Sequence, residues 1–429
     1  MRSTDTNPIR KVCVVGLGYI GLPTAATIAT RGVAVVGVDV NARVIEELNA
    51  GRAHFSEPDL DMLLDAAVTT GQLRASHQPE PADAFVIAVP TPFHNDKSAD
   101  LSFVEAATRK VAGVLKPNDL VVLESTSPVG TTARMREWIA AERPDLIVGP
   151  DVVHSDAMGS NPLAIHLAYC PERILPGRMV FELVENDRII GGVDKASAER
   201  AAALYRLFVR GELLQTTAPL AELVKLAENA YRDVNIAFAN ELSVLCDAWG
   251  LDVWDAVELA NRHPRVDILK PGPGVGGHCI AVDPWFLISA APNATPLMRA
   301  ARQVNDAKPA HVLAKVRAHI ERFERPRVAC LGLTYKPDVD DLRESPALLI
   351  VQTLANENAE LLVVEPHIEA LPPSLAGRTN VRHADLASIG DADIVLALVA
   401  HKAFKRIEPA ALLESIVIDA VGAWSGRGQ

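Results

Sequence analysis

One short stretch near the start of the chain constrains its fold more than any other. An apolar run from Lys11 to Val15 is followed by the glycine pattern GLGYIG at 16–21. An alanine-rich helical pattern then continues to about residue 30, and a second apolar run, VAVVGVDV, contains an acidic residue at Asp39. Strand, glycine turn, helix, strand and acid, in this order, are typical of the first βαβ unit of a dinucleotide-binding domain.

The glycine pattern predicts a site for NAD. Gly16, Gly18 and Gly21 allow a tight turn and a close approach of a pyrophosphate to the helix N-terminus. Asp39 is placed to accept hydrogen bonds from both hydroxyls of a ribose, and its charge repels a 2′-phosphate, which favours NAD over NADP. Arg43, four residues further on, weakens that preference.

The next part of the chain predicts how the first domain continues. Apolar runs of strand length lie at 84–90, 120–126 and 146–149 and alternate with helical segments. Such alternation predicts a parallel, doubly wound sheet. Thr91 and Thr126 come just after two of these strands, where such sheets bind ligands, so we place them beside the nicotinamide.

A long helical pattern begins near residue 217 and contains no Gly or Pro between Pro219 and Gly250. We interpret it as a spine that joins two domains. Its apolar residues recur with helical spacing, which predicts the buried face of the helix. These residues are Leu223, Leu226, Ala230, Val234, Ala237 and Phe238.

Strand-like runs return in the last third of the chain, near 327 and at 361–366, 393–398 and 416–419, with a helix expected at 345–358. This second α/β region lacks the glycine fingerprint, because Lys336 and Pro337 stand where glycine is needed. It should therefore bind something other than a dinucleotide. We expect an α/β protein with two Rossmann-like doubly wound domains joined by a long central helix. The expected bounds are 1–212, 213–320 and 321–429.

Composition excludes several classes of function. With 42 basic and 54 acidic residues the formal charge is −12, which argues against general nucleic-acid binding. No apolar run approaches the roughly 20 residues needed to span a bilayer, and the first residues lack the apolar segment of a secretion signal. The five cysteines are scattered and form no CxxC pair, so we expect no metal site, no disulfide framework and a cytoplasmic location.

The stretch GVGGHCIAVDP, at 274–284, places Cys279 after a run of glycines and before an apparent helix start. Glycines let a substrate approach closely, and a helix N-terminus stabilises a thiolate. Taken alone, a buried structural role for Cys279 is as well supported as a reactive one. An NAD site changes the balance, because oxidation of an alcohol through the aldehyde to an acid uses a thiol and two NAD, without a metal.

Other polar residues near these elements are candidates for proton transfer. Lys225, Asn229 and Arg232 share one face of the predicted spine, although a solvated stripe has the same spacing. Asp283 is suited to act as a helix N-cap or as a general base. Glu172, in YCPERILPG, is suited to activate water or to pair with the neighbouring Arg173.

Eight motifs together resemble the UDP-glucose/GDP-mannose dehydrogenase family over nearly the whole chain. They are GLGYIGLP, VPTP, ESTSPVGTT, YCPERILPG, ELVKLAENAYRDVN, NRHPRV, PGPGVGGHCIAVDP and GLTYKPDVDDLRESP. Within the family, the resemblance is greatest to the branch that oxidises the C6 alcohol of UDP-N-acetyl-D-mannosamine (UDP-ManNAc) to the uronic acid with two NAD. Four segments carry this likeness: CPERILPG, RDVNIAFANELS, ANRHPRV and GGHCIAVDPWF. The same reaction on UDP-N-acetylglucosamine or UDP-glucose stays open.

The resemblance also implies roles for individual residues. Cys279 is implied as the nucleophile that forms a thiohemiacetal and a thioester, and Lys225 as the proton donor and acceptor that stabilises the oxyanion. Asn229 is implied to share that charge, Asp283 to move protons through water, and Glu172 to assist thioester hydrolysis.

The binding sites follow from the same resemblance. Arg173 stands where the glucose enzymes carry Phe, and with Ile174 it is implied to contact an N-acetylated substrate. The rest of the sugar-nucleotide site is Arg232, His263, Arg265, Gly276, Tyr335 and Lys336. NAD is implied to be held by Tyr19, Ile20, Asp39, Arg43, Thr91, Thr126 and Arg343. Arg265 is implied to reach the substrate of a neighbouring subunit, which requires a homodimer, and the product is implied to enter a polysaccharide.

Two other classes of protein share parts of this pattern. A two-electron 3-hydroxyacid or 6-phosphogluconate-type dehydrogenase shares a Rossmann domain and a helical domain but needs neither Cys279 nor a second α/β domain. A non-catalytic nucleotide sensor has no need of Cys279 or Lys225, and both are present. The residues by themselves identify neither the sugar nor the base of the substrate.

Overall fold

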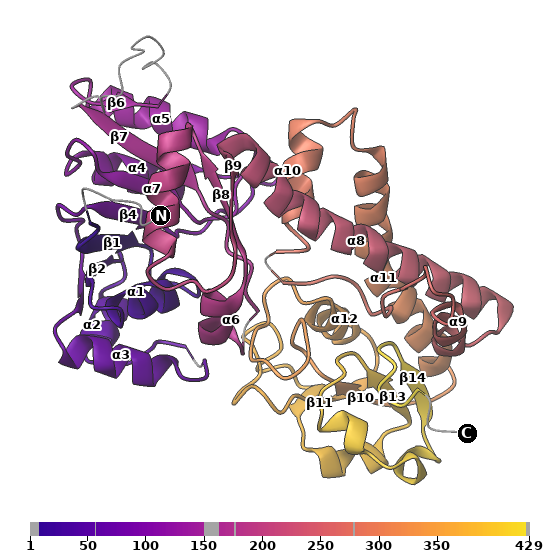
Figure 1. The fold of residues 1–429 in the computed structure, drawn as a ribbon. Coiled ribbons are helices and arrows are strands. Elements are labelled where there is room, and N and C mark those ends of the chain that lie inside the picture. Colours follow the sequence, from indigo (N-terminus) through magenta and orange to yellow (C-terminus); the bar gives the residue numbers. More distant parts are fainter. Residues whose placement is uncertain (1–7, 56, 150–162, 176, 278, 426–429) are drawn as a thin grey trace. The chain divides into compact units, whose positions relative to one another are not determined.

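The computed structural model describes residues 8–55, 57–149, 163–175, 177–277 and 279–425 (Figure 1). The chain divides into two compact units, Met1–Leu226 and Ala227–Gln429. Helix α8, Ala218–Trp249, begins in the first unit and ends in the second. Its 32 residues extend over about 48 Å at 1.5 Å per residue. The expected class, two Rossmann-like α/β regions connected by a long central helix, is confirmed.

The first unit is built on a sheet with the strand order β3-β2-β1-β4-β5-β7-β8-β9, and β6 pairs with β7. Every pairing is parallel except that of β7 with β8. The order reverses between β1 and β4, and ligands bind at the carboxyl ends of the strands at such a point. The bounds are β1 Lys11–Val15, β2 Ala34–Val38, β3 Leu73–Ser76, β4 Ala84–Ile87, β5 Leu120–Leu123, β6 Ile147–Val148, β7 Ala164–Tyr169, β8 Arg188–Gly192 and β9 Leu213–Thr217.

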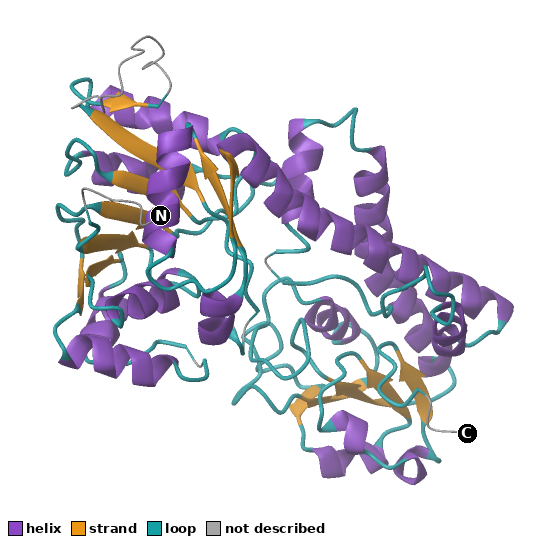
Figure 2. Ribbon diagram, viewed as in Figure 1, coloured by secondary structure: helices purple, strands orange, loops and turns teal. Residues whose placement is uncertain are grey.

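Helices cover both faces of this sheet, as Figure 2 shows. Along β1, Val12 and Val14 join the core formed with α1, α3 and α7, while Cys13 and Val15 join the core formed with α4 and α5. Because alternate residues point to opposite faces and both faces are buried, the strand is uniformly apolar. The helices are α1 Gly21–Ala29, α2 Ala42–Asn49, α3 Leu60–Thr69, α4 Ser102–Ala112, α5 Thr131–Glu142, α6 Met179–Glu185 and α7 Lys195–Tyr205.

The second unit carries a smaller parallel sheet with the order β12-β11-β10-β13-β14. Helices α11 and α12 pack on one face, and the short 3₁₀ helices η2, η3 and η4 close the other. The strands are β10 Arg327–Leu331, β11 Glu360–Val364, β12 Val381–His383, β13 Ile394–Ala397 and β14 Ile416–Asp419. The helices are α9 Val253–Ala260, α10 Asp283–Ala290, α11 Pro296–Ile320, α12 Pro346–Leu354, η2 Leu386–Asp391, η3 Phe404–Arg406 and η4 Pro409–Leu412. The helix expected to continue to residue 358 ends four residues earlier.

The buried face of α8 differs from the one that the apolar spacing predicts. Leu226, Ala230 and Ala237 are buried as expected, but Leu223 and Phe238 are 42% and 58% exposed. Asp233 is buried on this face, because Arg302 of α11 donates to its carboxylate from 2.6 Å. A polar group can be buried when its hydrogen bonds are supplied, so hydrophobic spacing alone misplaces the face.

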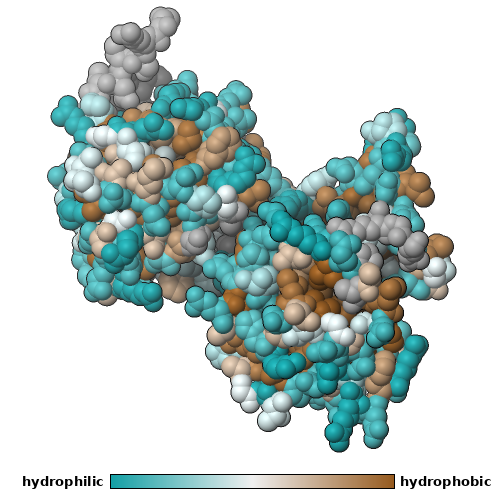
Figure 3. All heavy atoms as spheres, turned by 90° about the horizontal axis from the view of Figure 1, so that it is seen from below, coloured by the Kyte–Doolittle hydropathy of each residue, from teal (hydrophilic) through white to brown (hydrophobic). Residues whose placement is uncertain are grey.

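The surface shown in Figure 3 is mainly hydrophilic, with smaller apolar areas between polar ones. Among the described residues, no helix combines the length and the apolar character that crossing a membrane requires.

Candidate functional site

The glycine turn after β1 has the shape of a phosphate cradle. Gly16 has a φ of +92°, in the region that favours glycine, and its amide donates to the carbonyl of Val38 at 2.8 Å. A Cβ on Gly21 would lie 1.8 Å from the carbonyl oxygen of Gly16, so no side chain fits there. A Cβ on Gly18 would have no atom within 4 Å, which leaves open space beside the start of α1. The turn therefore fits the pyrophosphate of a dinucleotide.

Asp39 is fixed beside this turn, directly after β2. One carboxylate oxygen accepts from the amide of Leu17 at 2.9 Å, and the other accepts from the amide of Asn41 at 2.8 Å. The carboxylate is only partly buried, so lone pairs remain for ribose hydroxyls. Arg43 lies exposed in the first turn of α2. The geometry thus fits the predicted adenosine half of an NAD site.

The remaining cofactor residues are distributed over both units. Thr91 and Thr126 follow β4 and β5, and the Thr91 hydroxyl donates to the Thr126 carbonyl at 2.6 Å. Ile20 precedes α1 at its N-cap position, and the Tyr19 ring stacks on Phe55 with centroids 4.3 Å apart. Arg343 belongs to the second unit, where it pairs with Asp341 at 2.6 Å.

Glu172 and Lys225 are brought together in the first unit. Glu172 lies three residues past β7 and is 7% exposed, and the Lys225 ammonium donates to its backbone carbonyl at 2.7 Å. The backbone amide of Arg173 donates to the carboxylate of Glu172 at 2.7 Å. The same carboxylate forms an ion pair with Arg188 at 2.6 Å. Arg173 donates from its guanidinium to the carbonyl of Asp187 at 2.6 Å, and Ile174 is half-buried beside it in the chain.

Arg188 belongs to a buried charged cluster that sequence reasoning missed. Its guanidinium lies 5.4 Å from the ring centroid of Tyr205, and the Tyr205 hydroxyl donates to Glu124 at 2.6 Å. Burial raises the pKa of Glu124 to about 7; Arg188 opposes this rise and Glu172 adds to it. An arginine at the start of the apolar strand RIIGG is the signal that was available for finding this cluster.

In the second unit, Asn229 and Asp283 form a buried pair. The Asn229 amide donates to the Asp283 carboxylate at 2.5 Å, and the two residues are 9% and 2% exposed. The backbone carbonyl of Cys279 accepts from the amides of Val282 and Asp283 at 3.0 and 2.8 Å. This turn connects the candidate nucleophile to the carboxylate.

The position of Cys279 relative to α10 differs from expectation. Helix α10 begins at Asp283, so Cys279 lies one turn before it rather than at its N-terminus. All five cysteines are described and none forms a disulfide, but their thiols differ. Burial raises the pKa of Cys13 to about 11 and that of Cys170 and Cys330 to about 12, and burial also raises the pKa of Cys246. Cys279 is only partly buried, as a reactive thiol must be.

The glycines before Cys279 serve the packing of the chain itself. A Cβ on Gly276 would lie 2.5 Å from the carbonyl oxygen of Glu344. Gly277 has a φ of +82°, and its Cβ would lie 2.7 Å from the ring of Tyr335. Packing within the second unit therefore also requires the absence of a side chain at Gly276 and Gly277. The two glycines allow the cysteine loop to pack against Tyr335. Tyr335 and the next residue, Lys336, are both candidates for contacts with the substrate.

The remaining candidates lie at the surface of the second unit. Arg232 and His263 are exposed, so Arg232 does not share the buried environment of Asn229. His263 accepts from the backbone amide of Arg265 at 3.3 Å. Arg265 lines a surface hollow together with Tyr231 and Phe238 of α8.

Comparison with protein families agrees with this geometry. Models of the UDP-glucose/GDP-mannose dehydrogenase family match residues 10–209 (NAD binding domain), 220–307 (central domain) and 329–425 (UDP binding domain). The chain belongs to the UDP-glucose/GDP-mannose dehydrogenase family, a family of NAD-dependent dehydrogenases that act on sugar nucleotides. The prediction of NAD as the cofactor is confirmed.

Individual members of the family are similar to this chain over nearly its whole length. The chain is 55% identical over 419 residues to an NDP-N-acetyl-D-galactosaminuronic acid dehydrogenase of Ralstonia nicotianae, covering 97% of both chains. It is 52% identical over 405 residues to a UDP-N-acetyl-D-mannosamine dehydrogenase of Campylobacter jejuni, covering 94% of this chain and 98% of that one. A UDP-N-acetyl-mannosamine dehydrogenase structure from Staphylococcus aureus aligns at 40% identity with a TM-score of 0.84, covering 96% and 95%.

Proposed function

We propose that this protein oxidises the C6 alcohol of UDP-ManNAc to UDP-N-acetyl-D-mannosaminuronate. The observation that carries the proposal is the partly buried Cys279, tied by one turn to the Asp283–Asn229 pair, in a chain that also holds an NAD cradle. A two-electron dehydrogenase has no use for such a thiol. Relatives named for UDP-N-acetyl-D-mannosamine support the choice of sugar.

The proposed reaction converts an alcohol, two NAD⁺ and one water into a carboxylate, two NADH and three protons. NAD accepts the hydride in both oxidation steps. Water carries the proton of the C6 hydroxyl toward Asp283, and the Lys225 ammonium donates a hydrogen bond to the oxygen that becomes the aldehyde. The thiolate of Cys279 then adds to the aldehyde carbon, and loss of the second hydride leaves a thioester. Water cleaves the thioester and releases the thiolate.

Three residues assist these steps in the proposal. Asn229 donates a hydrogen bond to the oxyanion, and Asp283, buried against Asn229, accepts protons passed through water. Glu172 orients the water that cleaves the thioester, while Arg188 holds its carboxylate in place. Contacts to the sugar nucleotide are assigned to Arg173, Ile174, Arg232, His263, Gly276, Tyr335 and Lys336.

A second candidate substrate comes from the relative in Ralstonia nicotianae, which is named for an N-acetyl-D-galactosaminuronic acid nucleotide. The same chemistry on UDP-N-acetylgalactosamine needs the same thiol and the same cofactor. It therefore differs only in how the sugar hydroxyls are recognised.

The experiment that tests the proposal is the yield of NADH per mole of limiting sugar nucleotide. The purified protein receives excess NAD and, in turn, UDP-ManNAc, UDP-N-acetylgalactosamine, UDP-N-acetylglucosamine and UDP-glucose. We expect two NADH per UDP-ManNAc and a much lower rate with the others. Two NADH from another sugar alone would retain the mechanism and overturn the substrate. One NADH from every active substrate would return Cys279 to a structural role.

We further propose that the protein is a homodimer. Tyr231, Phe238, Leu245 and Trp249 recur at helical spacing along α8 and are 71%, 58%, 41% and 67% exposed. Such a stripe is costly to leave in water. Arg265 lines a hollow with Tyr231 and Phe238, and in the proposed dimer its guanidinium contacts the substrate of the partner subunit.

Light scattering tests this assembly. The wild type is expected at twice the chain mass of 46.0 kDa, and Phe238→Glu is expected to shift it toward the single-chain mass. Leu413→Glu, at an 81% exposed position outside α8, is the control and should leave the mass unchanged. A wild type that runs as a single chain would refute the dimer.

The proposal includes a three-domain division at 1–212, 213–320 and 321–429 and a cytoplasmic location. A thiol nucleophile must stay reduced, which a reducing compartment provides. Formation of a polysaccharide precursor is part of the same proposal.

A further inference from the structure

The two sheets begin with the same local geometry. In the first, the amide of Gly16 donates to the last residue of β2, and the amide of Leu17 donates to Asp39. In the second, Gly332, with a φ of +97°, donates to the last residue of β11 at 2.9 Å, and Leu333 donates to Glu365 at 2.7 Å. Glu365 therefore occupies the position in the second unit that Asp39 occupies in the first.

The two acids differ in what they face. Asp39 is partly exposed, whereas the Glu365 side chain is fully buried and its carboxylate lies 3.2 Å from Nε2 of His401, which is also fully buried. Burial by itself raises the pKa of Glu365, but the hydrogen bonds from His401 and from backbone amides outweigh it, and the pKa is lowered. The acid of the second sheet is thus buried, and its hydrogen bonds are to groups of the second unit itself.

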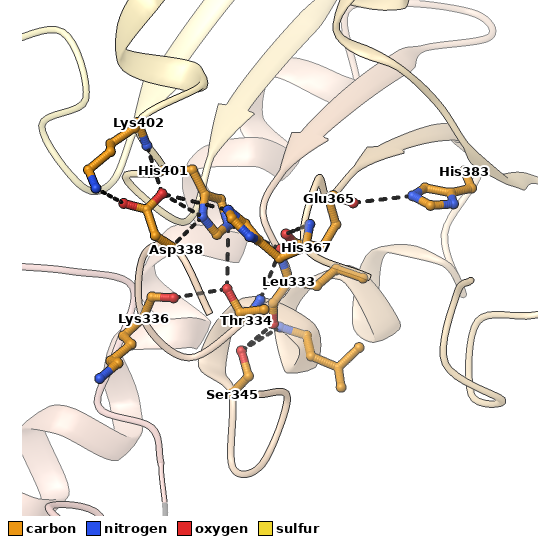
Figure 4. Close-up of polar contacts among 11 residues, drawn as sticks. Leu333, Thr334, Lys336, Asp338, Ser345, Glu365, His367, His383, His401 and Lys402 are labelled. Atoms are coloured by element: carbon orange, nitrogen blue, oxygen red, sulfur yellow. Dashed lines mark hydrogen bonds and ion pairs between the residues drawn. The ribbon is translucent and has the colours of Figure 1, made fainter. Parts of the chain in front are cut away.

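The tautomer of His401 follows from its second contact. Its Nδ1 lies 2.9 Å from the backbone nitrogen of Asp338, and a backbone N–H only donates. Nδ1 must therefore be the acceptor, which leaves the proton on Nε2, directed at Glu365. Figure 4 shows the ring of His401 between these two partners, with Thr334 below it.

These contacts fix one loop at several points. Glu365 accepts from the amides of Leu333 and Thr334, and the Thr334 hydroxyl donates to the carbonyl of Lys336 at 3.0 Å. At the other end, Asp338 has a φ of +59°, an unfavourable conformation for a residue with a side chain, and His401 holds its amide. Between these points lie Tyr335 and Lys336, and the Lys336 side chain extends away from the cluster (Figure 4).

We propose that His401 and Glu365 form a buried clamp that positions the Tyr335–Lys336 loop for the sugar nucleotide. His401 is a positioning residue that contacts no substrate, and it acts through the backbone of Asp338 and the carboxylate of Glu365. This inference rests on the proposed function, in which Tyr335 and Lys336 bind the substrate.

A divalent metal is the competing explanation for these residues. One ligand atom each from Asp338, His367 and His401 lies within 4.8 Å of the other two. A zinc ion binds a histidine nitrogen at about 2.0–2.1 Å. At Nδ1 of His401 that space is taken by the Asp338 amide, whose nitrogen is 2.9 Å away. The Lys402 ammonium also lies 3.5 Å from the Asp338 carboxylate. The geometry favours the clamp.

The test compares His401→Leu with His401→Asn in steady-state kinetics. Leucine removes both contacts, whereas the asparagine carbonyl retains an acceptor near the Asp338 amide. We expect His401→Leu to raise the KM for the sugar nucleotide at least about tenfold, as loss of one charged hydrogen bond implies, with the KM for NAD unchanged. His401→Asn should recover part of the loss. Arg382→Leu, at an exposed position on β12, is the control and should change neither constant.

Further measurements separate the outcomes. If His401→Leu does not fold, Glu365→Gln, which keeps the size of the side chain, must show the same selective rise in KM. Equal changes in both KM values, or a lower melting temperature with normal KM values, would overturn the clamp. One zinc per chain in the wild type, lost in His401→Leu, would replace the clamp with a metal site. A wild type that oxidises no UDP-sugar would instead refute the proposed function.

Discussion

Cys279→Ser is expected to lower the rate of acid formation by about three orders of magnitude. A serine hydroxyl is largely protonated at neutral pH, and an alkoxide leaves a tetrahedral intermediate less readily than a thiolate does. The variant should still bind NAD, because the cradle at Gly16–Gly21 belongs to the first unit. The measurement is NADH production together with mass-spectrometric detection of the uronate.

The control for this variant is Cys246→Ser. Cys246 lies in α8, is 3% exposed, and burial raises the pKa of its thiol. We expect its replacement to leave two NADH per substrate. A Cys279→Ser protein that also gives two NADH per substrate at the normal rate would remove Cys279 from the mechanism, since no other thiol of the chain is comparably accessible.

Arg188→Met is expected to lower the free energy of unfolding of the first unit by about 3–5 kcal/mol. The change leaves Glu172 buried without its ion pair and Glu124 without the nearby positive charge, and removing one partner from a buried ion pair has this cost. Turnover should fall as well, because Glu172 loses the contact that fixes its carboxylate. Urea unfolding and NADH production measure the two effects.

The control is Arg210→Met, which removes an exposed ion pair with Glu185. Exposed pairs contribute about 0–1 kcal/mol, so this variant should unfold almost as the wild type does. Equal destabilisation by Arg188→Met and Arg210→Met would show that the buried cluster has no special role.

The dependence on pH provides an independent check of the buried cluster. The pKa of Glu124 rises from 4.5 to about 7 on folding, mainly because of burial. The folded state then binds the proton more tightly, so the free energy of unfolding falls as pH rises from about 4.5 to about 7. Glu124→Gln should flatten this slope. The loss in free energy of unfolding caused by Arg188→Met should be smallest near pH 4.5, where Glu124 is protonated, and largest above about pH 7, where it is charged.

The fold was predictable because the apolar runs of this chain report burial on both faces of a parallel sheet. The expected strand from Lys11 to Val15 matches β1 at both ends, and 416–419 matches β14. Local spacing failed where burial depended on distant partners. Asp233 is buried because of Arg302, 69 residues away, and nothing in the spacing of α8 indicates that pairing.

The candidate site was predictable in part because the strand pattern locates the carboxyl ends of the strands. Thr91 and Thr126 follow consecutive strands of the sheet, so the topology brings them together. Arg188 could not be found in this way, because its role depends on two carboxylates that lie 16 and 64 residues before it and on the burial of all three. A short-range pattern reports which residues lie at strand ends, but it does not report which charges are buried together.

The strand order of the first unit also determines when that unit can fold. Val12 pairs with Ala84, so the centre of the sheet cannot form until at least 84 residues have been synthesised. Its described strands all lie between Lys11 and Thr217, so every one of them leaves the ribosome before the sheet of the second unit, which starts at Arg327. Domains generally fold as units and N-terminal first during synthesis. The first unit of the nascent chain can therefore complete its sheet, with the glycine turn at 16–21, while Tyr335 and Lys336 of the second unit are still to be translated.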